Sequence, residues 1–381
     1  MNHITFFITG NCNLSCAYCF ENTHHWPRCD TNPDVIKKSI DFLIAESGEN
    51  EKQLQIGFFG GEPLLRPDLV DMACEYSKAE GEKHGKVFNY SITTNMTLID
   101  EKVIEILKKH NITLLASVDG MPHRDNVRYW KGTQKSSATT ALSNLLLAQK
   151  HNINIGIRWT VAPEILEHLA EDVITLATLG FRNLAVEFVY ETRKWTEEDY
   201  KKLEAELRII AEFYISELRA GRNLYVKPIC DGFGTYTAEN RPQYRCGLGY
   251  NGVGVASDGD IQPCHRFVAR QDHKDWSLGN VLTEFDREKR DAMVSGWSYD
   301  KIKVDDGRSC KDCPIKIRCP GGSCFPVHLD ACNDFYTTPH CYCDLQLLCQ
   351  RVSNDVLGIL YGEKNPIIMG MLGQNAACNC Q

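Results

Sequence analysis

The first residues that could do chemistry are three closely spaced cysteines near the start of the chain. Cys12, Cys16 and Cys19 are separated by three and two residues and directly follow a strand-like run. Thiolates at this spacing can wrap one face of a four-iron, four-sulfur cluster and leave its fourth iron without a protein ligand. An iron of that kind can bind and activate another molecule. A structural zinc site remains the alternative, with His24 or His25 as its fourth ligand.

A second group of cysteines lies near the other end. The chain has 18 cysteines, and 12 of them, starting with Cys246, fall in the last 136 residues. This group includes Cys246, Cys264, Cys310, Cys313, Cys319, Cys324, Cys341 and Cys343. Since the first residues show no secretory signal, we expect a cytoplasmic location, where thiols stay reduced. The cysteines therefore indicate metal ligation and not disulfides.

The elements that must position these cysteines alternate between two patterns. Strand-like runs occur at residues 3–9, 54–59, 88–94, 112–118, 153–161 and 184–189. Amphipathic helical patterns separate them. Six βα units predict an α/β fold in which a parallel sheet curls into a partial (β/α)6 TIM-type barrel. The reactive groups of such barrels lie at the carboxyl ends of strands, which is where the first three cysteines fall.

The βα rhythm stops at about residue 225. Strand-like residues 253–255 and 260–262 flank Ser257-Asp258-Gly259, which predicts a hairpin. Cysteine-rich loops at 305–343 and a closing helix at 343–361 follow. We therefore expect two domains, a barrel at residues 1–224 and a cysteine-rich domain at 225–381.

Two motifs taken together point to a family. Cys12-x3-Cys16-Ala-Tyr18-Cys19 after the first strand and Gly60-Gly61-Glu62-Pro63 after the second resemble motifs of the radical S-adenosylmethionine (AdoMet) superfamily. The resemblance implies that the cysteines hold a 4Fe-4S cluster, that Tyr18 is the motif aromatic, and that Gly60 to Pro63 hold the methionyl amino group of AdoMet. Weaker matches imply further AdoMet contacts at Asn95, Ser117 and Arg128. Asn95 and Ser117 are also usual residues for a turn or a helix cap.

The late cysteines resemble the SPASM extension of radical enzymes that modify peptides and proteins. That extension holds two auxiliary 4Fe-4S clusters, so the implied cofactors are AdoMet and three clusters. The implied inner ligands are Cys246, Cys264 and Cys324, and the implied outer ligands are Cys310, Cys313, Cys319 and Cys343. Cys341 competes with Cys343 for the outer cluster. It could also complete the inner cluster, which otherwise keeps an open iron.

The resemblance also implies a reaction. In such enzymes the cluster reduces AdoMet, and the resulting 5'-deoxyadenosyl radical takes a hydrogen atom from the substrate. The run from Pro263 to Val268, with His265 after Cys264, looks like maturases of ribosomally made cysteine-rich peptides, which install thioether or carbon-carbon crosslinks. Sulfatase maturases, which form formylglycine, generally have aspartate at the position of His265, and they remain an alternative. A non-catalytic electron-transfer or scaffold protein is a second alternative.

His265 is the candidate catalytic residue in this scheme. Its imidazole could accept a proton near neutral pH, or it could instead hydrogen-bond a cluster sulfide or the backbone.

The expected partners follow from charge and from the reaction. A net charge of -8 and an isoelectric point of about 5.9 argue against nucleic acid, and no apolar run predicts a membrane span. A precursor peptide and an external one-electron reductant, such as a flavodoxin or ferredoxin, are expected. Eleven residues precede Cys12, so we expect the leader peptide to dock on the barrel, on the extension or on a separate leader-binding protein.

Overall fold

The computed structural model describes residues 1–19, 29–122, 127–189, 194–234, 247–295, 301–316, 318–319 and 324–377. The chain divides into two compact units. The first unit contains Met1–Ile155 and Gly247–Trp297, and the second contains Gly156–Cys246 and Ser298–Gln381.

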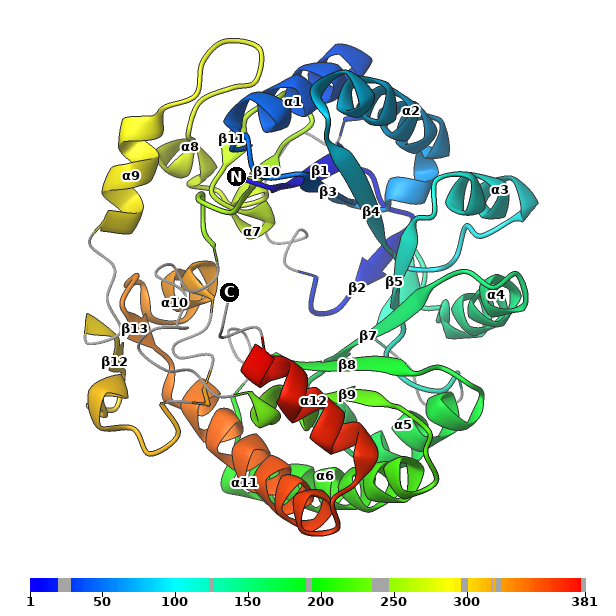
Figure 1. Cartoon of the computed structure of the whole chain (residues 1–381), viewed down its shortest axis with the longest axis vertical. Coiled ribbons are helices and arrows are strands. Elements are labelled where there is room, and N and C mark those ends of the chain that lie inside the picture. Colours follow the sequence, from blue (N-terminus) through cyan, green and yellow to red (C-terminus); the bar gives the residue numbers. More distant parts are fainter. Residues whose placement is uncertain are drawn as a thin grey trace. The chain divides into compact units, whose positions relative to one another are not determined.

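Strands and helices alternate through the first part of the first unit. They are β1 (His3–Thr9), α1 (Pro33–Glu46), β3 (Gln53–Gly60), α2 (Pro67–His84), β4 (Val87–Thr94), α3 (Glu101–Lys109), β5 (Thr113–Ser117) and α4 (Ala138–Lys150). β1, β3, β4 and β5 pair in that order, and every pair is parallel. Apolar side chains such as Ile4, Ile56 and Ile92 are fully buried on these strands. Figure 1 shows α1 and α2 together along one side of β1, β3 and β4.

Local sequence sets where these helices begin and end. α1 begins at Pro33 because the Asn32 side chain accepts a hydrogen bond from the backbone N–H of Asp34, while proline needs no donor partner there. α2 ends at His84 because Gly85 adopts a left-handed conformation with φ of 64°.

The predicted hairpin forms and joins the first unit. β10 (Gly252–Val255) and β11 (Ile261–Gln262) are antiparallel, and β10 also pairs with β1 in parallel. Three short helices follow, α7 (His265–Val268), α8 (His273–Trp276) and α9 (Arg287–Ser295). Val268 and Ala269 pack with Phe7 and Ala256 in a buried apolar cluster. The hairpin is therefore built onto the strand that opens the chain, while the domain boundary near residue 225 stays a prediction.

A separate two-stranded sheet contains Cys16, the second of the first three cysteines. β2 (Leu14–Cys16) pairs with β6 (Arg128–Trp130) in antiparallel orientation. The short 3-10 helix η2 (Pro63–Leu65) lies between β3 and α2.

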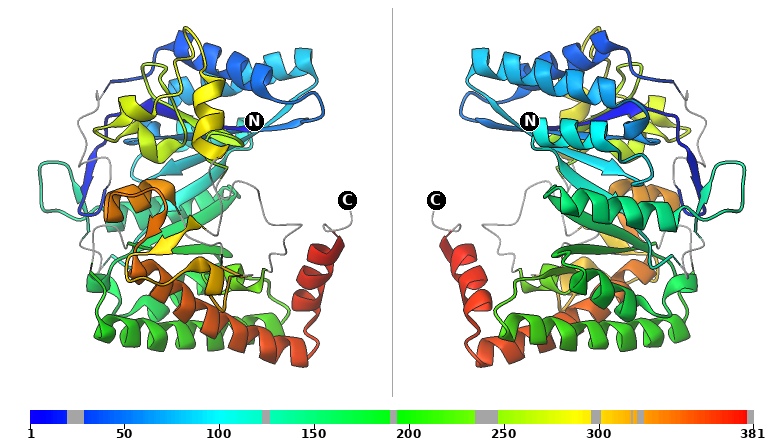
Figure 2. Two further views of the ribbon diagram at one scale, coloured as in Figure 1. Left: turned by 90° about the vertical axis from the view of Figure 1, so that its left-hand side faces the viewer. Right: turned by 90° about the vertical axis from the view of Figure 1, so that its right-hand side faces the viewer.

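The second unit continues the alternation and then carries the cysteine-rich segment. Its elements are β7 (Ile155–Val161), η3 (Pro163–Ile165), α5 (Leu169–Thr178), β8 (Asn183–Phe188), α6 (Glu197–Arg219), β9 (Tyr225–Lys227), η4 (Cys230–Phe233), β12 (Lys303–Val304), η6 (Cys310–Asp312), α10 (Phe325–Cys332), β13 (Thr337–Thr338), α11 (His340–Gly362) and α12 (Pro366–Ala377). β7, β8 and β9 are parallel neighbours. α11 lies along α6 (Figures 1 and 2), and Arg351 of α11 pairs with Glu204 of α6.

The predicted α/β fold with six βα units is confirmed. Each predicted strand forms, and its ends differ from the expected ones by at most two residues. The closing helix also forms and begins three residues earlier than expected, at His340. Within the described residues, no helix is both long enough and apolar enough to cross a membrane.

Candidate functional site

The loop after β1 presents the first three cysteines. Cys12, Cys16 and Cys19 are partly buried thiols. The β2–β6 ladder fixes this loop, and the backbone N–H of Ala17 adds a 2.9 Å hydrogen bond to the carbonyl of Val127. The backbone N–H of Leu14 donates to the Cys12 sulfur at 3.4 Å. A hydrogen-bonded backbone therefore sets the positions of the thiols.

Two glycines let the loop after β3 approach the cysteine loop. A Cβ atom on Gly60 would lie 2.3 Å from the carbonyl oxygen of Thr9, and one on Gly61 would lie 2.2 Å from that of Asn11. Both distances are far inside van der Waals contact, and Gly60 also has a φ of 121°. Only glycine fits such positions without moving the backbone. The Gly-Gly pair thus brings Glu62 beside the cysteine loop, where its N–H bonds the Asn11 carbonyl at 2.8 Å.

Glu62 is a buried carboxylate with a full set of donors. Its side chain accepts hydrogen bonds from the backbone N–H of Leu64 at 3.0 Å, the hydroxyl of Thr94 at 2.7 Å and the backbone N–H of Asn95 at 2.7 Å. Only 1% of the residue is exposed. Burial raises its pKa to about 7, and the three hydrogen bonds counteract part of that rise. A buried carboxylate held in this way can accept a hydrogen bond from an ammonium group.

Asn95, at the end of β4, connects this carboxylate to the cysteine loop. Its side-chain amide donates to the Asn13 side chain at 2.9 Å and lies 4.0 Å from the Cys12 sulfur. The structure therefore brings Asn95 and Glu62 together with the loop. Ser117 is the last residue of β5 and is partly exposed, and Pro63 is buried at the start of η2.

A buried charged group lies on the other side of the loop. Arg128 donates through Nε to Asp119, and the Tyr18 hydroxyl donates to the same carboxylate oxygen. The Arg128 Nη1 atom lies 3.8 Å from the Cys16 sulfur. Burial disfavours the charge on Arg128, but the charges of Asp119, Tyr18 and Cys16 outweigh burial and hold its pKa well above the ordinary value. Burial is also the main reason that the pKa of Tyr18 lies well above its usual range.

His265 lies in the same compact unit as these groups. It begins α7 directly after Cys264, and its ring centroid is 5.2 Å from that of Phe59, the residue before Gly60. Phe59 in turn contacts Phe7 of β1, with ring centroids 5.4 Å apart. The imidazole is therefore packed against the strand end that leads into Gly60 and Gly61.

Four late cysteines come together in the second unit. The charge of Cys343 interacts with those of Cys310, Cys319 and Cys313, and burial raises the pKa of the Cys343 thiol well above its usual range. Cys341 is also buried, but the charges that act on it come from Asp305 and Asp344. Cys324 directly precedes α10, at its N-cap position. Cys246, His24 and His25 lie outside the described residues.

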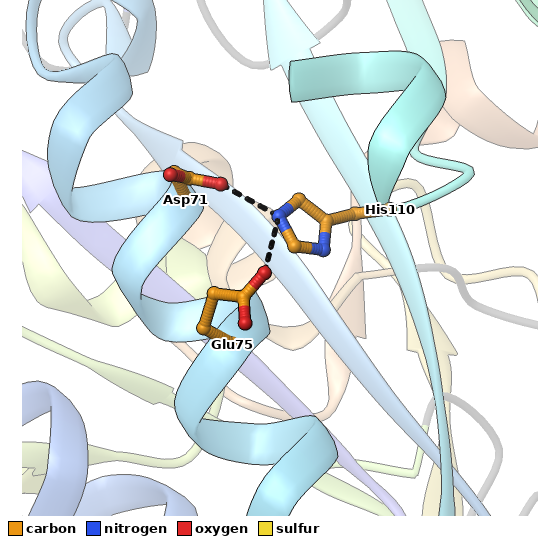
Figure 3. A group of neighbouring side chains, drawn as sticks. All are labelled: Asp71, Glu75 and His110. Atoms are coloured by element: carbon orange, nitrogen blue, oxygen red, sulfur yellow. Dashed lines mark hydrogen bonds and ion pairs between the residues drawn. The ribbon is translucent and has the colours of Figure 1, made fainter. Parts of the chain in front are cut away.

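Sequence reasoning missed two groups near these sites. Asp119 accepts hydrogen bonds from both Arg128 and Tyr18, and its place just after β5 was the available signal. The second group joins Asp71 and Glu75 of α2 to His110 after α3 (Figure 3). Lys109 Nζ lies 2.9 Å from a carboxylate oxygen of Asp71 and of Glu75. We therefore interpret this cluster as an ion-pair network between two helices and not as a metal site.

Sequence relatives agree with the motifs. The Radical SAM superfamily model matches residues 6–177. An uncharacterized protein of Methanocaldococcus jannaschii is 30% identical over 51% of this chain and 65% of its own length. The radical SAM cyclopropyl synthase TigE of Paramaledivibacter caminithermalis is 28% identical over 46% and 38%. The cysteine-type anaerobic sulfatase-maturating enzyme of Clostridium perfringens is 23% identical over 82% and 86%. The chain thus spans less than two thirds of the first two relatives.

Solved structures agree with the fold. The structure of anSMEcpe with bound AdoMet and Cp18Cys peptide matches with a TM-score of 0.73 at 18% identity, over 95% of this chain and 100% of that one. Streptococcus suis SuiB bound to precursor peptide SuiA matches with a TM-score of 0.58 at 18% identity, over 88% and 74%. The matched model and the two motifs lead to one conclusion: residues 6–177 of the chain form a radical SAM domain.

Proposed function

We propose that the protein is a radical SAM maturase that takes a hydrogen atom from a ribosomally made precursor peptide and installs a crosslink, either thioether or carbon-carbon. The observation that carries the proposal is the joining of the cysteine loop to the buried Glu62 through Gly60 and Gly61. The likeness to SuiB bound to its precursor peptide supports a peptide substrate.

The residues fit the cofactors that the family uses. Three thiols on one loop suit a 4Fe-4S cluster with an open iron, and the Glu62 carboxylate suits the amino group of AdoMet. Asn95, Ser117 and Arg128 remain the proposed further contacts to AdoMet. When bound, a reduced cluster and AdoMet would supply the radical that takes the hydrogen atom.

We also propose two auxiliary 4Fe-4S clusters. The gathering of Cys310, Cys313, Cys319 and Cys343 supports the outer one and favours Cys343 over Cys341 as its late ligand. Cys246, Cys264 and Cys324 remain the proposed inner ligands. If Cys341 is a fourth ligand, every iron of this inner cluster has a protein ligand. If it is not, one iron of the inner cluster stays open. We propose neither state over the other.

The proposed crosslinking step must remove two hydrogen atoms from the peptide. One leaves as a hydrogen atom to the radical, and 5'-deoxyadenosine is the product. The other leaves as a proton, which we assign to His265, and as an electron, for which an iron-sulfur group is the acceptor class. The contact of His265 with Phe59 supports this assignment, because it places the imidazole near the end of β3.

The test uses the full chain, reconstituted anaerobically with iron and sulfide. We expect about twelve irons per chain, which is three four-iron clusters. With AdoMet, a reductant and a short cysteine-rich peptide encoded by a neighbouring reading frame, we expect 5'-deoxyadenosine and a peptide that has lost two hydrogens per crosslink. The Cys16→Ala variant should form no 5'-deoxyadenosine.

Other outcomes select the alternatives. An aldehyde in place of a Cys or Ser side chain would identify a sulfatase maturase, which the similarity over 82% of the chain keeps in view. A reconstituted wild-type protein that forms no 5'-deoxyadenosine, with or without peptide, would contradict catalysis and support an electron-transfer or scaffold role.

A further inference from the structure

Arg128 is fixed against one of the proposed cluster ligands. In the β2–β6 ladder it lies directly opposite Cys16, and its Nη1 atom is 3.8 Å from the Cys16 sulfur. Its Nε donates to Asp119, whose side chain is fully buried, and its guanidinium carbon lies 5.4 Å from the centroid of the Tyr18 ring. The backbone ladder, the carboxylate and the ring together hold the cation beside the thiol.

The cysteines of this loop have different electrostatic surroundings. Cys12 receives a neutral backbone N–H from Leu14 at 3.4 Å and has the neutral amide of Asn95 at 4.0 Å. Cys16 faces a full positive charge that is 8% exposed to solvent. Because water screens a buried charge weakly, Arg128 acts on its surroundings more strongly than a surface arginine would.

Reduction of a 4Fe-4S cluster adds one negative charge to it. A cation beside a ligand thiolate stabilises the reduced state, and hydrogen bonds to cluster sulfurs and solvent exposure are known to set cluster potentials. Asp119 carries the opposite charge, so it partly offsets Arg128 while holding it in place.

We infer that Arg128 raises the reduction potential of the cluster held by Cys12, Cys16 and Cys19, and that Asp119 and Tyr18 act as its positioning residues. This inference rests on the proposed function, since it requires that cluster. It differs from a contact with AdoMet because it predicts an effect on the cluster when AdoMet is absent.

The test is a redox titration of the reconstituted full chain, followed by electron paramagnetic resonance without AdoMet. The relevant signal is the one that changes when AdoMet is added afterwards. For Arg128→Gln we expect about tenfold less reduced cluster at a fixed ambient potential, which corresponds to a midpoint about 59 mV more negative. Arg128→Lys keeps the charge and should shift the midpoint less. Asp119→Asn keeps a side-chain oxygen that can accept from Arg128 Nε but removes the offsetting charge, so it should move the midpoint in the positive direction.

Arg66→Gln is the matched control. Arg66 belongs to the same compact unit and pairs with Asp30 and Asp68, so this change removes an equal charge without touching Cys16. Its midpoint should equal that of the wild type.

The outcomes separate this inference from the proposed function. An unchanged midpoint in Arg128→Gln would overturn the inference. If that variant loses its cluster, Asp119→Asn decides: an unchanged midpoint there overturns the inference, whereas a more negative one shows that Arg128 raised the potential and has been displaced from Cys16. A wild-type protein that binds no iron would instead overturn the proposed function.

Discussion

Glu62 keeps a carboxyl group in a place that water hardly reaches. Its pKa is raised from 4.5 to about 7, so the folded protein binds this proton more tightly than the unfolded chain does. The free energy of unfolding should therefore fall as the pH rises from about 4.5 to about 7, by about 3 kcal/mol for this group. This loss of stability accompanies a buried carboxylate that can pair with an ammonium group.

AdoMet affinity should follow the titration of Glu62. Only the deprotonated carboxylate can pair with the ammonium group, so affinity should rise with pH and level off above about 7. Calorimetric titration of the reconstituted protein should give roughly tenfold weaker binding at one pH unit below that value. In Glu62→Gln this pH dependence should disappear and binding should be weak throughout. A flat profile in the wild type would contradict the role of Glu62.

His265 should affect product formation more than radical formation. Replacement by Gln removes the proton acceptor while keeping a polar side chain of similar length beside Phe59. We expect 5'-deoxyadenosine to form still, while crosslinked peptide per 5'-deoxyadenosine falls by about 100-fold, the lower end of typical acid-base contributions. Mass spectrometry with parallel quantification of 5'-deoxyadenosine measures the ratio. An equal loss of both products would indicate a structural role for the imidazole.

At the scale of elements, the first turn of α11 separates two cysteines that the sequence could not rank. Residues two positions apart on a helix point to different sides, so Cys341 and Cys343 cannot face the same partner. The charges that act on Cys343 include those of Cys310, Cys319 and Cys313, which supports Cys343 as the proposed outer ligand. Both cysteines fit the ligand pattern of the sequence equally well. Only the orientation of the helix relative to the preceding loops distinguishes them.

Iron counting should distinguish these two cysteines. Cys343→Ala should lower the iron content of the reconstituted chain by at least about one atom, because one iron of the outer cluster loses its protein ligand. Cys341→Ala should keep the outer cluster, and it serves as the matched control from the same helical turn. Equal iron loss in both variants would contradict the assignment of Cys343.

The contact between the loops after β1 and β3 should not tolerate a methyl group. In Gly61→Ala the new Cβ would lie 2.2 Å from the Asn11 carbonyl oxygen, so the loops must separate. We expect a loss of about 1–3 kcal/mol in the free energy of unfolding, together with weaker AdoMet binding. Gly358→Ala on α11 is the control, because no other described atom outside the adjacent helix backbone lies within 4 Å of the added group. Denaturant titration measures both variants, and equal stabilities would contradict the close approach.

At the scale of the whole molecule, local sequence patterns were enough for the parallel strands but not for their long-range partners. β1 and β3 are apolar, β-branched and aromatic runs, so each was recognisable by itself. The pairing of β10 with β1 joins residues far apart in the chain, which no local pattern reports. β2 and β6 are three residues each, too short for periodicity to appear. The partnership of Arg128 with Cys16 depends on that short ladder, so the sequence pointed to Arg128 only through the family resemblance.

A fragment of residues 1–224 should not fold on its own. Without β10 and α7, one edge of β1 has no partner strand, and Phe7 loses its contacts with Ala256 and Val268. We expect the fragment to aggregate, and size-exclusion chromatography with thermal unfolding should show no cooperative monomer. The full chain serves as the reference. A soluble monomer with cooperative unfolding would instead favour the predicted boundary near residue 225.

Because His3 pairs with Gly252, β1 lacks one partner strand until late in the synthesis of the chain. At typical translation speeds, roughly 12 to 50 s pass between the emergence of these two strands from the ribosome. For that time the outer edge of β1 is open to other chains, and the cysteine loop behind it lacks part of its surroundings. Expression at low temperature or with a chaperone that shields strand edges should therefore increase the yield of chain able to accept iron.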